Sequence, residues 1–209
     1  MTIRSHLLSW FPAFIVTLVF ASFTLFVAKG SVIYLGLLLT VVYVLPALCF
    51  RVHDLLWPLR EGLSRLDEAS YSPWWGAHQI QLIYDAVPFL EGLLRALPGL
   101  YSAWLRLWGS QVGSKVYWTP RVEIADRSLM VIGDRVVFGH QVACYPHVVS
   151  RKHERLVLYV KRVRVDNDVF LGAGSRLGPG AHIQEGTVLP VLTDVGIGQA
   201  LAEQAKSQD

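Results

Sequence analysis

Four histidines lie in the C-terminal half of the chain, where they could act in catalysis: His140, His147, His153 and His182. A neutral imidazole accepts a proton from a hydroxyl or an amine near neutral pH, so each of them is a candidate general base. A histidine taken alone is more often a solvated or packed side chain. The choice among the four therefore depends on the elements that position them.

The segment that carries these histidines repeats with a period of six residues. An apolar residue opens each hexad, namely Val112, Trp118, Ile124, Ile132, Phe138, Cys144, Val165, Leu171, Leu177, Ile183, Leu189 and Val195. Gly, Asp and Asn recur at corner positions, where the backbone needs a positive φ. In a triangular β-coil each hexad forms one face, and its first residue fills the interior. The period predicts a mainly β fold, a parallel β-helix over residues 111–201, rather than a β-sandwich with regular turns.

The repeat is irregular at two places. A slip of two residues follows the hexad that begins at Ile124, and a longer interruption runs from about Val149 to Arg164. Basic residues gather around the longer interruption: Arg151, Lys152, Arg155, Lys161, Arg162 and Arg164. Such a cluster is either a solvated basic face or a binding site for phosphate groups. The second interpretation predicts a ligand that carries phosphate.

The hexads are similar to those of the hexapeptide-repeat acyltransferases, and the resemblance covers residues 112–200. It implies a left-handed parallel β-helix, a homotrimer, and acyl-CoA bound as co-substrate in the groove between adjacent β-helices, with no metal expected. The run from Trp104 to Gly113, and the Pro-His-Val-Val that begins at Pro146, resemble acyltransferases associated with membrane proteins. We therefore expect a membrane-anchored member of this family.

The resemblance also assigns a catalytic role to one histidine. Family members extrude a loop where the repeat is interrupted, with a histidine at its base, and His147 occupies that place. As general base, His147 would deprotonate a hydroxyl or amine while backbone N–H groups hold the oxyanion. The sequence offers three acidic residues that could orient the imidazole and does not choose among them: Glu123, Asp126 and Glu154.

Residues beyond the interruption are expected to bind acyl-CoA. By resemblance, the N–H of Ala173 is an oxyanion donor, Gly174 lies beside it, and Val191 contacts the pantetheine chain one rung later. Lys161 and Arg162 are the expected phosphate ligands of the basic cluster. Two features depart from the family pattern. A proline precedes Val191 where Gly is usual, and the Asn that often lies ahead of the catalytic histidine is not evident.

The first fifty residues predict a membrane anchor. No charged side chain occurs in residues 7–28 or 30–50, and each run exceeds the ~20 residues that span a hydrocarbon core as a helix. Lys29 separates the runs, which predicts a helical hairpin over residues 1–51. Pro46 should either kink the second helix or mark where it approaches the interface. A cleaved signal peptide is the alternative, but its apolar stretch would be shorter and no second span would follow.

The flanking charges predict the orientation of this hairpin. Arg4 precedes it, and Arg51, Arg60 and Arg65 follow it, whereas Lys29 stands alone at its tip. Because positive residues favour the cytoplasmic side, both termini are expected in the cytoplasm. The predicted location is therefore the inner (cytoplasmic) membrane, crossed more than once. A lipid precursor or lipid-linked saccharide is the acceptor that such an anchor favours.

Residues 52–110 are predicted to form amphipathic helices, which we call the collar, and residues 202–209 a flexible tail. Leucines recur in the collar at helical spacing, and six of the seven tryptophans precede the repeats. Tryptophan favours the membrane–water boundary, so we expect the collar to lie in the interface. Packing of the same aromatic side chains against the β-helix is the alternative, and the two do not exclude each other.

Composition excludes some classes of function. The 209 residues carry a formal net charge of only +3, which gives no nucleic-acid signature. Cys49 and Cys144 are isolated in the sequence and are expected to be buried thiols.

Two alternatives to the acyltransferase remain open. A metal enzyme similar to γ-class carbonic anhydrases would need three convergent histidines, for which His140, His147 and His182 can be proposed. A non-catalytic β-helix scaffold is the other. Within the acyltransferase hypothesis, His140 and His153 compete with His147 for the role of base, and His182 does so less well.

Overall fold

The computed structural model describes residues 2–68 and 70–202. They form two units, each described by itself below. The helical unit extends to Arg60 and includes Glu68–Pro88, and the β-helix unit comprises Glu61–Asp67 and the chain from Phe89 onward. The division falls inside the predicted collar, so that part of the collar belongs to each unit. Of the predicted tail, only Ala202 lies among the described residues.

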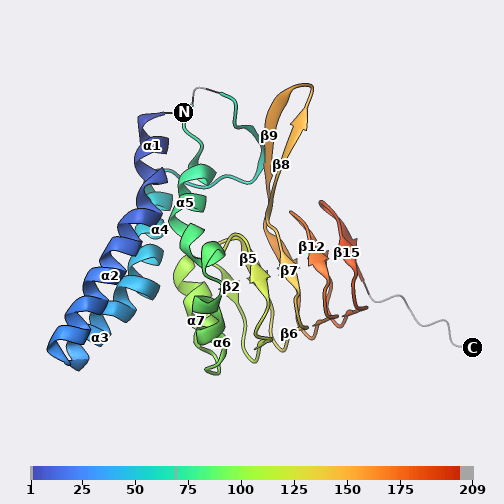
Figure 1. The fold of residues 1–209 in the computed structure, drawn as a ribbon. Helices are drawn as coiled ribbons and strands as arrows, with labels where there is room; N and C mark the ends of the chain where they lie inside the picture. The colour runs from blue at the N-terminus through green and yellow to red at the C-terminus, as the bar shows by residue number, and fades with distance from the viewer. Residues whose placement is uncertain (1, 69, 203–209) are drawn as a thin grey trace, which may run out of the picture. The chain divides into compact units, whose positions relative to one another are not determined.

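Two long apolar helices make up most of the helical unit (Figure 1). The first contains α1 (Ile3–Ser9) and α2 (Phe11–Lys29), and the second contains α3 (Val32–Leu39), the π-helical turn η1 (Thr40–Val44) and α4 (Leu45–Leu56). Gly30, at φ 62°, ends α2, and the Ser31 hydroxyl accepts the N–H of Ile33 to begin α3. The stretches Ile3–Lys29 and Val32–Leu56, with 27 and 25 residues, are long and apolar enough to cross a membrane, by length and composition only.

The predicted irregularity near Pro46 is present, and the neighbouring helix compensates for it. Proline has no N–H, so the carbonyl of Val42, four residues earlier, loses its helical hydrogen bond. The hydroxyl of Tyr84, on α5 (Pro73–Ala86), donates to that carbonyl at 2.6 Å. The π-helical turn ends at Val44, two residues before the proline. The break in the second helix is thus held by a side chain that lies 42 residues away in sequence.

The β-helix unit is built on three parallel sheets. The first has the order β16-β13-β10-β5-β2, the second β14-β11-β6-β3 and the third β15-β12-β7-β4. The strands of the first sheet are β2 (Gln111–Val112), β5 (Met130–Ile132), β10 (Val163–Val165), β13 (His182–Ile183) and β16 (Ala200–Leu201). The second contains β3 (Tyr117–Trp118), β6 (Val137–Phe138), β11 (Phe170–Leu171) and β14 (Val188–Leu189), and the third contains β4 (Glu123–Ile124), β7 (Ala143–Cys144), β12 (Arg176–Leu177) and β15 (Asp194–Val195).

The registers confirm the predicted hexads. Ile124, Cys144, Leu177 and Val195 pair in order across the third sheet, and each is a hexad's first residue. All four are buried, as are the first residues on the other two sheets. The parallel β-helix is therefore confirmed, while its left hand stays a prediction. Cys144 is fully buried as expected, and burial raises the pKa of its thiol, whereas Cys49 is half-buried.

Glycine has two separate uses in the hexads, of which only one was predicted. The fourth residue of most hexads has a positive φ, and it is a glycine at Gly174 but Arg135 and Leu192 elsewhere. Glycine at the second position answers a different need. A Cβ on Gly172 would lie 2.5 Å from the backbone of Pro190 in the next rung, so neighbouring rungs can stack only because the side chain is absent.

Two helices cover the first rung of the β-helix. These are α6 (Phe89–Arg95) and α7 (Leu100–Trp108), and Trp104 and Trp108 of α7 are buried. The indole of Trp118 donates to the Ser102 hydroxyl at 2.8 Å and stacks on Phe138. For Trp104 and Trp108 the alternative of core packing therefore holds, while interfacial contact by the rest of the collar stays a prediction. A helical cap closes the apolar end of a solenoid in this way.

The interruption of the repeat is an ordered β-hairpin. β8 (His147–Lys152) and β9 (Arg155–Val160) are antiparallel, and His153 and Glu154 form the turn with positive φ. β1 (Gly62–Arg65) adds a third strand on the other side of β9. The helical interpretation of the leucine pattern is therefore wrong around Leu63, because the open edge of β9 offers this segment strand pairing. Figure 1 shows the hairpin projecting beyond the coil.

Candidate active site

His147 stands at the base of this hairpin. It is the first residue of β8 and pairs with Val160, the last residue of β9. The carbonyl of the preceding Pro146 accepts the N–H of Lys161 at 2.8 Å, which closes the hairpin where it leaves the coil. The His147 side chain is 19% exposed. The excursion and the position of the histidine agree with the sequence expectation.

The structure brings His147 together with Asp126. Nδ1 of His147 lies 2.6 Å from Oδ2 of Asp126, whose side chain is only 1% exposed. The contact follows from the sheet register, since Ile124 and Cys144 are neighbours in the third sheet. Asp126 and His147 follow these two residues closely and therefore leave the sheet at the same edge.

The two-residue slip of the repeat positions this carboxylate. Asp126 opens the irregular turn between β4 and β5, and its own carbonyl accepts the N–H of Leu129 at 3.1 Å. The hydroxyl of Ser110 donates to the carbonyl of Arg127 at 2.7 Å and accepts the N–H of Met130 at 3.0 Å. The backbone on the C-terminal side of Asp126 is thus held by side-chain contacts from outside the hexads.

A buried ionic cluster fastens the same turn to the helical cap. Nε of Arg127 lies 2.5 Å from Oε1 of Glu91, and the two side chains are 2% and 5% exposed. Oε2 of Glu91 accepts hydrogen bonds from Arg95 and from the hydroxyl of Tyr101. Burial raises the pKa of the Tyr101 hydroxyl, which keeps it a neutral donor. Sequence reasoning missed this cluster.

The other acidic candidates lie elsewhere. Glu123 is exposed on β4. Burial raises the pKa of the neighbouring Tyr145 hydroxyl, and the negative charge of Glu123 adds to that rise. Glu154 sits in the turn at the far end of the hairpin from His147. Of the three acidic residues that the sequence offered, the structure places Asp126 alone against His147.

The competing histidines have different surroundings. His140 is exposed, and its carbonyl accepts the N–H of Gly174. His153 is exposed in the hairpin turn. Nε2 of His182 lies 2.8 Å from Asp166, but their side chains are 36% and 43% exposed, so that water competes for this pair. His182–Asp166 is therefore an exposed counterpart of the buried pair at His147.

The residues expected to bind acyl-CoA gather at a different edge of the coil. Ala173 and Gly174 turn from the second sheet into the third, and the Ala173 carbonyl accepts the N–H of Leu192, next to Val191. His147 leaves the third sheet toward the first. The structure thus groups Ala173, Gly174 and Val191, but a single chain does not bring them to His147.

The two expected phosphate ligands also differ in position. Lys161 is exposed at the base of the hairpin, and its aliphatic stem covers Gly180. Arg162 forms an ion pair with Glu61 at 3.1 Å. Lys161 is therefore the cation that lies beside the base of His147's hairpin.

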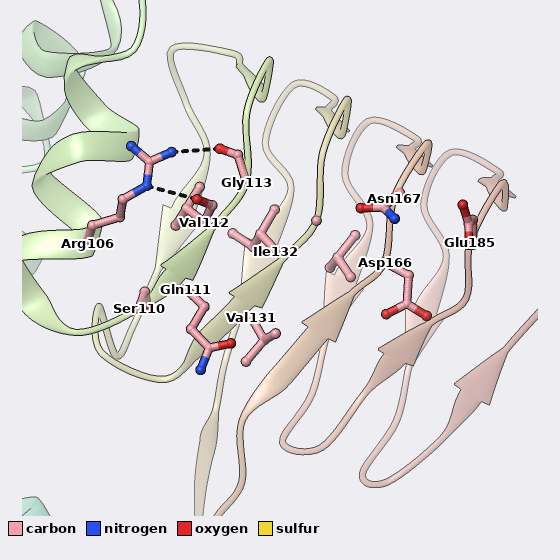
Figure 2. Close-up of a pocket in the computed structure, with 12 residues that line it drawn as sticks. Arg106, Ser110, Gln111, Val112, Gly113, Val131, Ile132, Asp166, Asn167 and Glu185 are labelled. Carbon is pink, nitrogen blue, oxygen red and sulfur yellow. Dashed lines mark hydrogen bonds between the residues drawn. The ribbon is translucent and has the colours of Figure 1, made fainter.

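A groove of about 590 Å³ lies along the first sheet and does not include His147. Figure 2 shows its lining, which runs from Arg106 past Val131 to Asp166 and Glu185. The guanidinium of Arg106 is engaged in two hydrogen bonds within the chain, to the carbonyls of Val112 and Gly113 at 2.8 and 2.7 Å. The remaining charges are acidic and do not suit the phosphates of CoA.

Within residues 2–68 and 70–202, no group of three His, Cys, Asp or Glu side chains could hold a metal ion. His140, His147 and His182 belong to different turns and strands. A single chain therefore does not gather the histidines that the carbonic-anhydrase alternative requires.

Comparison with known proteins gave likenesses in structure alone. No family model matches the chain, and no curated protein matches it. A hexapeptide-repeat acetyltransferase of Vibrio cholerae, in complex with acetyl-CoA, is similar over 59% of this chain and 84% of its own, at 16% identity and a TM-score of 0.44. A galactoside acetyltransferase in complex with coenzyme A is similar over 55% of this chain and 74% of its own, at 15% identity and a TM-score of 0.38.

Serine acetyltransferase isoform 3 of Entamoeba histolytica, in complex with cysteine, is similar over 83% of this chain and 75% of its own, at 11% identity and a TM-score of 0.35. At these values the likenesses do not carry an argument about activity. The sheets and registers of the chain itself establish the parallel β-helix, and its solved structural neighbours include hexapeptide-repeat acetyltransferases.

Proposed function

We propose that the chain is a membrane-anchored acyltransferase that moves a short acyl group, such as acetyl, from acyl-CoA to a hydroxyl or amine of a lipid precursor or lipid-linked saccharide. The observation that carries this proposal is the contact between His147 and the buried carboxylate of Asp126. A histidine whose Nδ1 is held by a buried carboxylate is oriented to exchange protons through Nε2.

His147 acts as general base in the proposed reaction. Its Nε2 removes the proton of the acceptor as the acceptor oxygen or nitrogen bonds to the thioester carbonyl carbon. Asp126 keeps the other imidazole proton on Nδ1 and stabilises the imidazolium that forms. When the tetrahedral intermediate collapses, the carbon–sulfur bond breaks and His147 returns its proton to the sulfur of CoA. Acyl-CoA supplies the activated carbonyl.

Ala173 is the proposed oxyanion donor. It is half-buried, and within the described residues its N–H donates no hydrogen bond, so this N–H can take up a carbonyl oxygen as negative charge develops. Gly174 and Val191 border the same corner, where the pantetheine arm would lie. Lys161 and Arg162 are the proposed partners of the CoA phosphates.

The proposed site lies between two copies of the chain in a homotrimer. His147 and Ala173 occupy different edges of the coil, so a complete site needs one residue from each copy. The outer face of the second sheet supports such an assembly. Tyr117, Val137, Phe170 and Val188 form an outward column there, and Tyr117 and Val188 are 62% and 66% exposed. A column of exposed apolar side chains favours contact with another protein surface.

The anchor and the acceptor are proposed together. The two long apolar helices would cross the inner membrane as a hairpin with both termini in the cytoplasm, where acyl-CoA is available. Lipid extracts of cells with the protein, with the His147→Ala variant, and without the protein test the function by mass spectrometry. We expect one lipid species that carries one added acyl group only with the unaltered protein. Equal acylation with the variant would instead support the non-catalytic scaffold.

Mixed assemblies test whether the site is shared between copies. His147→Ala and Ala173→Pro should each abolish activity, because one removes the base and the other the N–H donor. When both variants are co-expressed, an intact base and an intact donor meet at about one site in four of random trimers, so about a quarter of the activity should return. Release of the CoA thiol from acetyl-CoA measures the rate.

The matched control mixes His147→Ala with Asp126→Asn. Both lesions affect residues that touch within one chain, so no subunit has an intact pair and the mixture should stay inactive. Recovery in the control, or none in the first mixture, contradicts a site shared in this way.

A further inference from the structure

An open apolar groove runs along the helical unit. It has a volume of about 350 Å³, and its lining includes Leu8, Val52, His53, Leu56 and Trp57. This volume is within the range of small-molecule sites. Most of the walls belong to the two stretches that are long and apolar enough to span a membrane. Val52 and Leu56 are each 59% exposed, so the groove is open along one side.

A positively charged side chain lies beside one end of this groove. The guanidinium of Arg4 lies 5.0 Å from the ring centroid of Trp57, which lines the groove. Within the described residues Arg4 has no carboxylate partner. Arg4 lies at the start of the first apolar stretch, and Trp57 directly follows the end of the second. The headgroups of a membrane leaflet would lie at this level. An unpaired cation at this depth favours an anionic headgroup.

A buried histidine lies at the same end. His53 is 5% exposed, and its Nε2 lies 2.6 Å from the hydroxyl of Tyr71. Burial raises the pKa of Tyr71 to about 12, so the hydroxyl stays protonated and can donate to Nε2. Nδ1 of His53 has no hydrogen-bond partner in the described part of the chain and is itself buried. A ligand headgroup at this end of the groove would therefore meet Arg4 rather than the imidazole of His53.

The close packing of α5 shapes this end. A Cβ on Gly76 would lie 2.0 Å from the Tyr71 hydroxyl, 2.5 Å from Nε2 of His53 and 2.8 Å from the Leu8 side chain. Only glycine therefore lets α5 approach the Tyr71–His53 pair and the groove wall.

We propose that this groove binds one hydrocarbon chain of a phosphate-headed lipid, with the phosphate against Arg4. The apolar walls bury the chain, and the cation selects the headgroup. The site lies within the helical unit and does not depend on the proposed acyl transfer.

Lipid retention by the full chain in detergent tests this proposal by native mass spectrometry. The probes are dioleoyl phosphatidic acid and dioleoylglycerol, which share their chains and differ in the phosphate. We expect one retained phosphatidic acid and binding of dioleoylglycerol that is weaker by about 10-fold or more. Arg4→Gln should remove this preference without altering a groove wall. His147→Ala should retain the lipid fully, which separates this site from catalysis.

Two tryptophan variants test the location. Val52→Trp fills the groove and should abolish retention of phosphatidic acid. Val27→Trp is the matched control, because Val27 has a similar exposure of 65% but does not line the groove. Equal retention of both lipids, or equal loss in both tryptophan variants, would show non-selective lipid around the helices and overturn the proposal. The Arg4→Gln result remains decisive if Val52→Trp folds poorly.

Discussion

Replacement of Asp126 by Asn is expected to lower kcat by about 100-fold or more, and His147→Ala by about 100- to 10,000-fold. The expectation rests on the 2.6 Å contact between Nδ1 of His147 and the Asp126 carboxylate. An Asn amide would donate to Nδ1 instead of accepting from it. The imidazole proton would then move to Nε2, where the acceptor proton must be received. The histidine would remain in place with its proton on the wrong nitrogen.

This result can be distinguished from a loss of folding. Rates of CoA thiol release should fall through kcat, with KM for acetyl-CoA nearly unchanged, because Asp126 is not expected to touch CoA. The exposed pair His182–Asp166 provides the control, so His182→Ala and Asp166→Asn should each keep activity within about 2-fold, since an exposed ion pair contributes little. Asp126→Asn with unaltered kcat would remove the pair from the mechanism.

The sequence predicted the core of the β-helix because its signal is local. Each hexad carries its own apolar first residue, and the stacking of Leu177 on Val195, three hexads later, follows from the period alone. The interruption after His147 was visible for the same reason. Both features depend on residues that lie within a few positions of each other.

The partner of His147 required information from the neighbouring rung. All three acidic candidates, Glu123, Asp126 and Glu154, could orient an imidazole equally well by residue type. Only the register of β4 against β7 places Asp126 beside the histidine. A signal was present in the slip of the repeat after Ile124. An irregular turn in the strand next to the interruption is a place where a side chain can leave the regular pattern.

Long-range partners explain the remaining differences. The leucines around Leu63 have helical spacing, but the strand there is stabilised by pairing with β9, almost a hundred residues later. Trp104 and Trp108 belong to a helix whose composition is typical of a membrane interface. Both side chains are buried instead, because the first rung of the β-helix needs an apolar cap. In each case a tertiary contact outweighs the local preference.

The buried cluster around Glu91 is expected to be the most sensitive point of stability in the β-helix unit. Glu91 accepts from both Arg127 and Arg95, so the three side chains together carry one excess positive charge. Glu91→Gln would leave two guanidinium groups buried side by side. Removal of one partner from a buried ion pair costs about 3–5 kcal/mol, and this variant should reach the upper end of that range.

Arg127→Met should lower the free energy of unfolding less than Glu91→Gln does. It should nevertheless lower kcat in a protein that stays folded. The remaining pair, Glu91 and Arg95, is neutral, and methionine fills much of the space of the arginine stem. The turn that begins at Asp126 loses its link to α6. We therefore expect folded protein with kcat lowered by about 10-fold or more, as when other groups that orient a functional side chain are removed. Thermal unfolding and CoA release measure the two effects separately.

An exposed ion pair of the same kind gives the comparison for this variant. Arg135 contacts Asp168 at 2.5 Å through the same Nε atom, but the two side chains are 51% and 43% exposed. Solvent screens that pair, so Arg135→Met should leave both the unfolding temperature and kcat nearly unaltered. If Arg127→Met behaves like Arg135→Met in both measurements, the buried cluster does not position Asp126. If it lowers kcat alone, the helical cap holds the carboxylate that orients His147.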